Sequence, residues 1–215
     1  MFVRSSWKPR TNDEMFDLID AHPWARLVTN GEHGPLATNL PLLLDRRRGR
    51  FGLLVGHLAR ANAHAQALAA AQAPTLAIFE GPYTYVTPSW YPGRDMPSTY
   101  YYTAVHCYGH VRLQSDAELE ASLGTLVARM EAPIPNGWSL GEIPRSEVTR
   151  RLPAIVGFEL EIERLEGKFK LGQDEPRRDA LAVAGRLDEG TEPSLRELAD
   201  LIRHYNMDRP DANPV

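Results

Sequence analysis

The alternation of apolar and polar residues along the chain predicts a protein built mainly of short β-strands. The cleanest alternation covers residues 154–162, where Val156, Phe158 and Leu160 fall on one face and Glu159 on the other. Successive side chains of a strand point to opposite faces of a sheet, so such a segment buries one face and leaves the other in solvent. We therefore expect the apolar side chains to enter the core and Glu159 to face water.

Several further segments show β-rich or alternating patterns. They are residues 25–29, 35–44, 51–55, 75–79, 83–87, 102–113 and 168–171. The run from Asn30-Gly31 to His33-Gly34 is a hairpin signal, and Pro41 inside the next strand pattern places that point at a sheet edge or a bulge. Short strands joined mostly by hairpins, with helices at a few corners, indicate a closed or nearly closed antiparallel barrel.

Helix start signals and helical periodicity define the remaining elements. Capping boxes, in which a Ser or Thr precedes a Glu by three residues, begin at Thr11, Ser115 and Ser194. The predicted helices cover residues 12–21 and 63–71, the segment between Ser115 and Pro133, residues 144–151 and 177–186, and a last helix from Ser194. We predict an α+β chain that is mainly β, with one barrel domain over residues 1–175 and a helical extension over 176–215 packed on it.

Charge and hydropathy exclude some classes of partner. The formal net charge is −4 and the isoelectric point is near 6.0, which gives no global attraction to nucleic acid or anionic membrane. The one basic cluster, Arg46 to Arg48 with Arg50, is interpreted as a solvated turn, and no basic recognition helix is present, so direct DNA binding is not expected. Without a signal-peptide pattern or a membrane-length apolar run, we expect a cytoplasmic location.

The residue types also limit the chemistry. A single cysteine excludes an internal disulfide framework, and Cys107 lies in a strand pattern that predicts burial. His106 and His110 lie four residues apart in a strand, a span of about 13 Å that is too long for one metal ion. We predict hydrogen-bonded histidines and no metal site. Phosphate-loop, dinucleotide-binding and nucleophile-elbow motifs are absent.

Four short segments carry the remaining chemistry. They are an exposed-backbone segment at 38–41, a strand-to-helix corner at 56–62, an aromatic loop at 89–91 and a basic strand end at 170–173. The corner combines Arg60 with the amides and positive dipole end of a helix, which favour an anion. Together the segments suit a flat aromatic cofactor with a phosphate tail. The alternatives are that Asn62 is only a helix cap, Arg60 a surface residue and the aromatic loop part of a core hairpin.

In this order and spacing, the motifs resemble one known family, the FMN-binding negative transcriptional regulators, or PaiB-like proteins, of the FMN-binding split-barrel fold. The resemblance covers about residues 1–185. It rests on A-T-N-L-P-L (37–42), G-H-L-A-R-A-N (56–62), F-E-G-P (79–82), Y-V-x-P-S-W-Y (85–91), A-V-H-x-Y-G (104–109), I-V-G-F-E-L (155–160) and K-L-G-Q (170–173).

The resemblance implies a homodimer that binds FMN in a groove between its subunits. The residues that it assigns to the phosphate are His57, Arg60 and Asn62, and those that it assigns to the isoalloxazine ring are Thr38, Asn39 and Leu40. Those that complete the groove are Ser89, Trp90, Tyr91, Lys170 and Gln173. The chain departs from the family pattern at Tyr100-Tyr101-Tyr102 and at Gly172, from which we expect a weaker hold on FMN or acceptance of another planar ligand.

The functions that follow from this resemblance differ in kind. The first is a regulator or sensor that acts indirectly through bound FMN. The second is a flavin-dependent oxidoreductase, in which a nicotinamide reduces FMN and an unidentified small molecule takes the electrons; the sequence assigns no catalytic residue. The third is haem binding in the same type of barrel, with His57 or His106 as the iron ligand.

Overall fold

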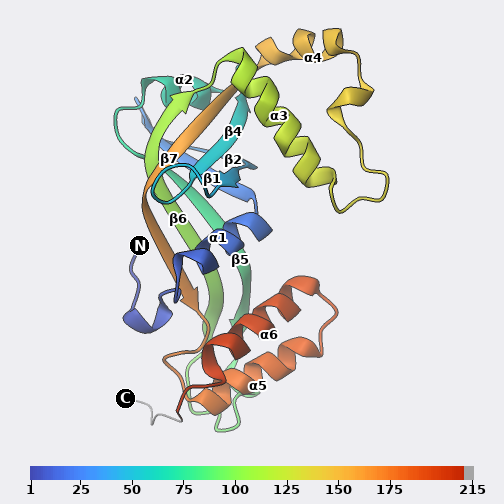
Figure 1. Cartoon of the computed structure of the whole chain (residues 1–215). Helices are drawn as coiled ribbons and strands as arrows, with labels where there is room; N and C mark the ends of the chain where they lie inside the picture. The colour runs from blue at the N-terminus through green and yellow to red at the C-terminus, as the bar shows by residue number, and fades with distance from the viewer. Residues whose placement is uncertain (211–215) are drawn as a thin grey trace. The chain divides into compact units, whose positions relative to one another are not determined.

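The computed structural model of the chain describes residues 1–210, which form seven strands and six α-helices (Figure 1). The strands are β1 (Trp24–Gly31), β2 (Gly34–Pro41), β3 (Leu43–Asp45), β4 (Leu53–Ala59), β5 (Thr75–Val86), β6 (Thr99–Leu113) and β7 (Ile155–Lys170). The α-helices are α1 (Asn12–Ala21), α2 (Ala63–Ala70), α3 (Asp116–Glu131), α4 (Arg145–Arg151), α5 (Arg177–Asp188) and α6 (Pro193–Asn206). Short 3-10 helices are η1 (Ser5–Trp7), η2 (Pro88–Trp90), η3 (Leu140–Glu142) and η4 (Leu152–Ala154).

The strands of residues 1–210 form one antiparallel sheet in the order β2-β1-β5-β6-β7-β4-β3. This confirms the predicted mainly-β fold with helices at its corners and two helices at the C-terminal end. Two pairs of predicted strands are single long strands, β5 and β7. Gly81 interrupts the pattern within β5, yet a Cβ there would overlap the hydroxyl of Thr103 and press on Leu18. This glycine marks close packing rather than a turn.

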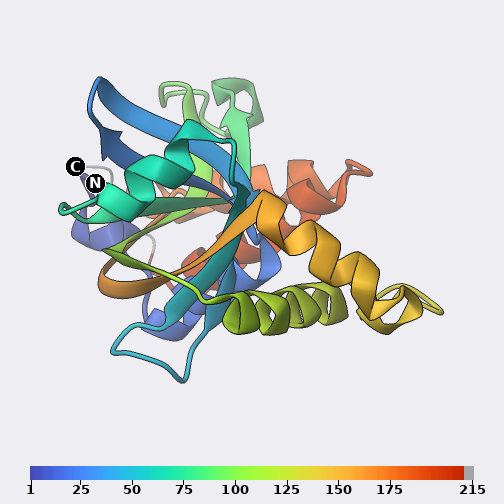
Figure 2. The same ribbon diagram turned by 90° about the horizontal axis from the view of Figure 1, so that it is seen from above.

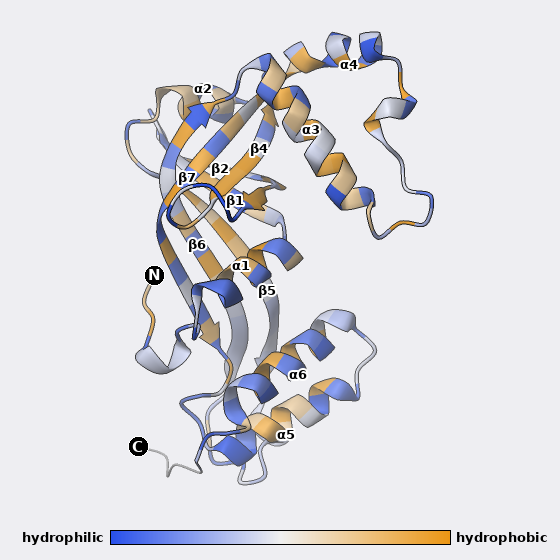
Figure 3. Cartoon of the chain, in the orientation of Figure 1, coloured by the Kyte–Doolittle hydropathy of each residue, from blue (hydrophilic) through white to orange (hydrophobic). Residues whose placement is uncertain are grey.

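The chain divides into two compact units, each built from segments that are distant in sequence. Unit 1 comprises residues 1–18, 80–105 and the described residues from 166, and unit 2 comprises residues 19–79 and 106–165. The fully buried side chains of unit 1 include Phe169, Leu171, Val183, Leu198 and Ile202, and those of unit 2 include Leu27, Leu54, Phe158, Leu160 and Ile162. Figure 3 shows apolar residues concentrated along the strands, whereas polar residues mark the outer faces of the helices.

In unit 1, α5 and α6 pack side by side (Figure 1). The predicted N-cap of the last helix, Ser194, was wrong by two residues, because the N-cap is Glu192 and α6 begins with Pro193 at its first turn. Proline suits this position because its fixed φ is helical and its missing N–H has no intrahelical partner. The amide of Asn206 donates to the carbonyl of Leu171 at 2.9 Å, which ties the end of α6 to the end of β7. The last five residues of the predicted extension lie outside the described residues.

In unit 2, β1 and β2 form the predicted hairpin, with Gly31 opposite Gly34. Figure 2 shows α2 beside this hairpin. The strand predicted at 35–44 is broken after Pro41, and the N–H of Leu42 donates to the carbonyl of Pro23 at 2.8 Å. Because β2 is the first strand of the sheet order, the prediction of a sheet edge at Pro41 is confirmed.

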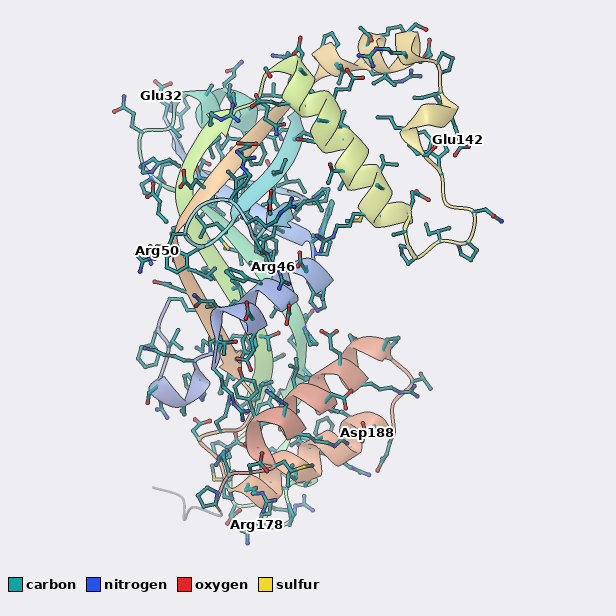
Figure 4. All side chains as sticks on the ribbon, viewed as in Figure 1. Glu32, Arg46, Arg50, Glu142, Arg178 and Asp188 are labelled. Carbon is teal, nitrogen blue, oxygen red and sulfur yellow. The ribbon has the colours of Figure 1, made fainter. Side chains whose placement is uncertain are left out.

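The arginine-rich turn after β3 holds three ion-paired arginines, Arg46, Arg47 and Arg48, and Arg112 of β6 joins the pair made by Arg48. Arg48 donates to both carboxylate oxygens of Glu159 at 2.7 and 2.9 Å, and Arg112 donates to the same group at 2.8 Å. The prediction that Glu159 faces water was wrong, since only 6% of the residue is exposed. Hydrogen bonds from Arg48 hold its pKa below the usual value despite burial. Figure 4 shows Arg46 near the end of α1, where its Nε donates to Asp20 at 2.9 Å.

Cys107 is packed in the core, and the two strand histidines, His106 and His110, each contact a neighbouring polar side chain. Cys107 is fully buried, as predicted, and burial raises the pKa of its thiol. His110 contacts the carboxylate of Glu163 at 2.8 Å. Residues 1–210 contain no group of three or more candidate ligands that could hold a metal ion. Within the same residues, no helix is both long and apolar enough to cross a membrane.

Candidate functional site

The strand-to-helix corner begins later than the sequence predicts. β4 continues to Ala59 and pairs with β7, so that His57 lies opposite Gly157 inside the ladder. Gly56 permits this because a Cβ there would press on Leu42 and Phe158. His57 is therefore a strand residue and precedes the corner. Burial lowers the pKa of its ring, which favours the neutral form.

Arg60 holds the corner against the start of β7. Its N–H donates to the carbonyl of Ala154 at 2.8 Å, its Nε to Pro153 at 2.7 Å and its Nη2 to Ile155 at 3.0 Å. Three donors of one residue thus satisfy three successive carbonyl groups. Among residues 1–210 its Nη1 group has no hydrogen-bond partner, so the guanidinium can contact an anion while it supports the backbone.

Asn62 joins the corner to β2. Its side-chain oxygen accepts from the N–H of His64 at 3.0 Å and caps α2, and its Nδ2 donates to the hydroxyl of Thr38 at 3.3 Å. The ring nitrogen Nδ1 of His64 lies 2.9 Å from the same hydroxyl. The structure thereby brings two predicted residues, Thr38 and Asn62, together around one oxygen atom.

His64 is the member of this cluster that the sequence prediction missed. It is 2% exposed and burial lowers its pKa. The sequence holds a signal for it, because a histidine two residues after a capping asparagine lies in the first helical turn. Its side chain is therefore close to the residues that the cap contacts. The predicted corner ends at Asn62 and therefore excludes the histidine two residues later.

The three residues predicted to line a ring do not share one face of β2. Leu40 is buried opposite Ala25, whereas Asn39 is exposed opposite Arg26. Alternation along a strand places Thr38 and Leu40 on one side and Asn39 on the other. A ligand on the Thr38 side of β2 can contact the backbone of Asn39 at the sheet edge. The side chain of Asn39 points to the opposite side and is out of its reach.

The remaining predicted residues belong to unit 1. Ser89 is exposed and its N–H donates to the hydroxyl of Thr87 at 3.2 Å, while Trp90 is partly buried and Tyr91 is part of the core. Lys170 donates to the hydroxyl of Thr99. These side chains line the loops at the ends of β5, β6 and β7.

Gln173 braces its own loop. Its Nε2 donates to the carbonyl of Phe169 at 2.6 Å, and its Oε1 accepts from the N–H of Leu171 at 2.7 Å. Gly172 lies between Leu171 and Gln173 and has a φ of +84°, a conformation that favours glycine. A Cβ at this position would overlap the hydroxyl of Tyr101. Close packing of Tyr101 therefore explains the glycine that departs from the family pattern.

The donors at the start of α2 suit an anionic group. The dipole at the start of a helix favours negative charge. Two N–H groups of this turn already have partners, since that of His64 donates to Asn62 Oδ1 and that of Ala65 to the carbonyl of Asn62. Arg60 adds a charged donor, and the partly exposed Thr38 adds a hydroxyl. This donor set fits the phosphate and the polar edge of a flavin mononucleotide.

The family follows from a comparison with known proteins. Residues 1–164 match the model of the family described as "Putative FMN-binding domain". The chain belongs to this family. The matched residues include all of unit 2 except Leu165, and with it both strands that carry Thr38 and His57.

One curated relative matches nearly the whole chain. It is the protease synthase and sporulation protein PAI 2 of Bacillus subtilis, which is 26% identical over 202 residues and covers 94% of this chain and 96% of its own length. This likeness and the family match confirm the resemblance seen in the sequence.

Solved structures share the fold. The FAD and heme binding protein of Mycobacterium smegmatis has a TM-score of 0.55 at 19% identity and covers 77% of this chain and 74% of its own. The flavocytochrome Anf3 of Azotobacter vinelandii has a TM-score of 0.56 at 15% identity and covers 77% and 70%. At these identities the likeness shows the split-barrel fold alone.

Proposed function

We propose that this protein binds FMN, with the phosphate at the start of α2 and the isoalloxazine ring beside β2. The observation that carries the proposal is the family match over residues 1–164, which contains the cluster that joins Thr38 to Asn62. Bound flavin supplies one- and two-electron redox chemistry. The chain's own contribution is to bind and orient it.

Each part of the corner has a role in this proposal. The positive dipole end of α2 and the Nη1 group of Arg60 bind the phosphate, because both favour negative charge. The Thr38 hydroxyl and the edge backbone at Asn39 and Leu40 contact the ring. His57 is neutral at physiological pH because of burial, so it contributes hydrogen bonding rather than charge.

The biological role that we propose is regulation through bound flavin rather than through DNA. The relative PAI 2 is named for protease synthesis and sporulation, which supports a regulatory role. The net charge of −4 argues against a direct complex with DNA. A sensor that responds to the redox state of flavin, or to a small molecule that reacts with it, satisfies both observations.

The absorption spectrum of the purified protein tests the cofactor. We expect flavin bands at about 370 and 450 nm, and saturable uptake of added FMN. One protein of the same fold is named for binding FAD and heme, so a Soret band at about 400 nm is the alternative outcome. A protein that binds haem but not FMN would overturn the proposal.

The phosphate position is tested by Asn62→Asp. The new carboxylate still accepts from the N–H of His64 and keeps the cap, but it places negative charge beside the proposed phosphate. We expect FMN affinity to fall by about tenfold, which corresponds to about 1.4 kcal/mol, with a smaller change for riboflavin. Gln66→Glu, on the exposed face of α2, is the matched charge control. Equal losses for both flavins would place the phosphate elsewhere.

We further propose that the protein is a homodimer with FMN in a groove between subunits. In unit 1, Tyr83 and Tyr85 on β5 and Tyr100 on β6 are exposed, and the rings of Tyr85 and Tyr100 lie 5.6 Å apart. An exposed aromatic patch of this kind is typical of an interaction surface. Light scattering should return twice the chain mass of 24.1 kDa. A monomer that still holds FMN at micromolar concentration would contradict this.

A further inference from the structure

The contacts around Thr38 determine which atom is the donor and which the acceptor in each hydrogen bond. Asn62 has one acceptor oxygen, and the N–H of His64 occupies it at 3.0 Å. The other half of the amide, Nδ2, can only donate. The contact of 3.3 Å between Nδ2 and the Thr38 oxygen therefore has Asn62 as its donor, and one lone pair of the hydroxyl is used.

The protonation of His64 follows from its burial. Its Nε2 is buried and has no hydrogen-bond partner among residues 1–210, whereas its Nδ1 lies 2.9 Å from the Thr38 oxygen. A neutral imidazole carries one hydrogen, on either nitrogen. A hydrogen on Nε2 would leave a buried N–H unsatisfied, which is rarer in proteins than an unsatisfied acceptor. The hydrogen therefore resides on Nδ1 and is donated to Thr38.

The Thr38 hydroxyl then accepts two hydrogen bonds, from Asn62 and from His64. A hydroxyl has two lone pairs and one hydrogen, so its own hydrogen is directed away from both partners. Thr38 is partly exposed on the edge strand β2, so a bound molecule can reach it. The cluster thus prepares a hydrogen-bond donor of fixed direction.

We propose that His64 is a positioning residue that fixes the Thr38 hydroxyl as a donor to an acceptor atom of the isoalloxazine ring. The inference rests on the proposed function, since it assigns a contact within the proposed flavin site. A fixed donor stabilises the ligand more than a rotating hydroxyl does, because no ordering is needed when the ligand binds. It also favours negative charge on the ring, and hence the reduced flavin.

Thr38 variants test the contact with the ligand. Thr38→Val keeps the branched shape and removes the donor, and Thr38→Ser keeps the hydroxyl as the matched control. Loss of one hydrogen bond of about 0.5–1.5 kcal/mol predicts binding weaker by about two- to tenfold. We expect this loss for both FMN and riboflavin, together with a shift of the visible absorption maximum of the bound flavin. A loss confined to FMN would assign the hydroxyl to the phosphate and overturn the inference, as would unchanged binding.

His64 variants and its ring nitrogens test the positioning role. Nitrogen NMR of the flavin-free protein should show the hydrogen of His64 on Nδ1. His64→Leu keeps the Thr38 hydroxyl but no longer fixes its direction, so it should weaken flavin binding by less than Thr38→Val does. His64→Asn, which can offer an N–H near the position of Nδ1, should restore most of the loss.

Failure of this inference and failure of the proposed function give different results. A hydrogen on Nε2 would mean that Thr38 donates to the histidine, which overturns the inference whether or not flavin binds. Folded His64→Leu protein with wild-type flavin affinity and spectrum would also overturn it. Wild-type protein that binds neither FMN nor riboflavin would instead refute the proposed function, and the contact to the ring with it.

Discussion

Replacing Gly109 with alanine is expected to prevent folding or to lower the melting temperature by at least about 8 °C, from a loss of about 4 kcal/mol or more in the free energy of unfolding. Gly109 is buried in β6, and a Cβ there would overlap the backbone oxygen of Glu161 in β7. A backbone atom in a sheet cannot move aside as a flexible side chain can. The clash must therefore separate two neighbouring strands of the sheet.

Gly124→Ala is the matched control. Gly124 lies in the interior of α3, and a Cβ there would meet no atom within 4 Å. Alanine is the better helix former, so this variant should be more stable by about 0.5–1 kcal/mol. Circular dichroism melts of both variants check the pair. Gly109→Ala protein that melts within about 2 °C of wild type would show that β6 and β7 are not in such close contact.

Asp179→Asn is expected to raise the free energy of unfolding at pH 7 by about 1–3 kcal/mol, because a buried charge without a hydrogen-bond partner costs more than a neutral amide in the same place. Asp179 is fully buried in the first turn of α5, and neither carboxylate oxygen has a hydrogen-bond partner among residues 1–210. The nearest ion-pair partner, Arg178 Nε, lies 3.5 Å away. Asparagine retains the shape and removes the charge.

The pH dependence follows from the same burial. Desolvation raises the pKa of Asp179 and also that of Glu175. A carboxyl group with a raised folded-state pKa contributes stability that is fully present below its unfolded pKa and is lost as the pH rises through the folded value. The advantage of Asp179→Asn over wild type should therefore be largest at pH 7 and shrink as the pH falls toward 4, which denaturant titrations at several pH values measure.

Asp200→Asn provides the control for this charge change. Asp200 is in the same unit but is exposed on α6, where it pairs with Arg203 at 3.2 Å. Exposed pairs of this kind contribute little, so we expect a change within about 0.5 kcal/mol at all pH values. An Asp179→Asn variant that is less stable than wild type at pH 7 would mean that Asp179 has a partner that stabilises its charged form.

The sequence determined the local elements because their signals lie within a few residues of one another. The capping box at Ser115 and Glu118 forms as predicted, and so does the hairpin that closes between Gly31 and Gly34. Asn62 caps α2 at the predicted residue. The spaced motifs also determined the family, since their order along the chain is itself information that needs no coordinates.

The meeting of residues that are distant in sequence depends on the folded chain and leaves no local signal. Glu159 was predicted in solvent because its strand alternates, yet Arg48 and Arg112, which are 111 and 47 residues away, pair with it and allow its burial. The residues next to Glu159 in the sequence give no indication that those guanidinium groups will lie beside it. The same holds for Gly109, whose role depends on how closely a strand that follows much later in the chain approaches it.

The candidate site divides in the same way. The sequence determined that a capped helix follows a strand at Asn62, because a capping side chain bonds to its own helix. It could not show that Arg60 is held by carbonyls more than 90 residues away, or that His64 and Asn62 converge on Thr38 from another strand. Those contacts join segments that are brought together only when the sheet forms, and hydrogen bonds between distant segments leave no periodic pattern in the chain.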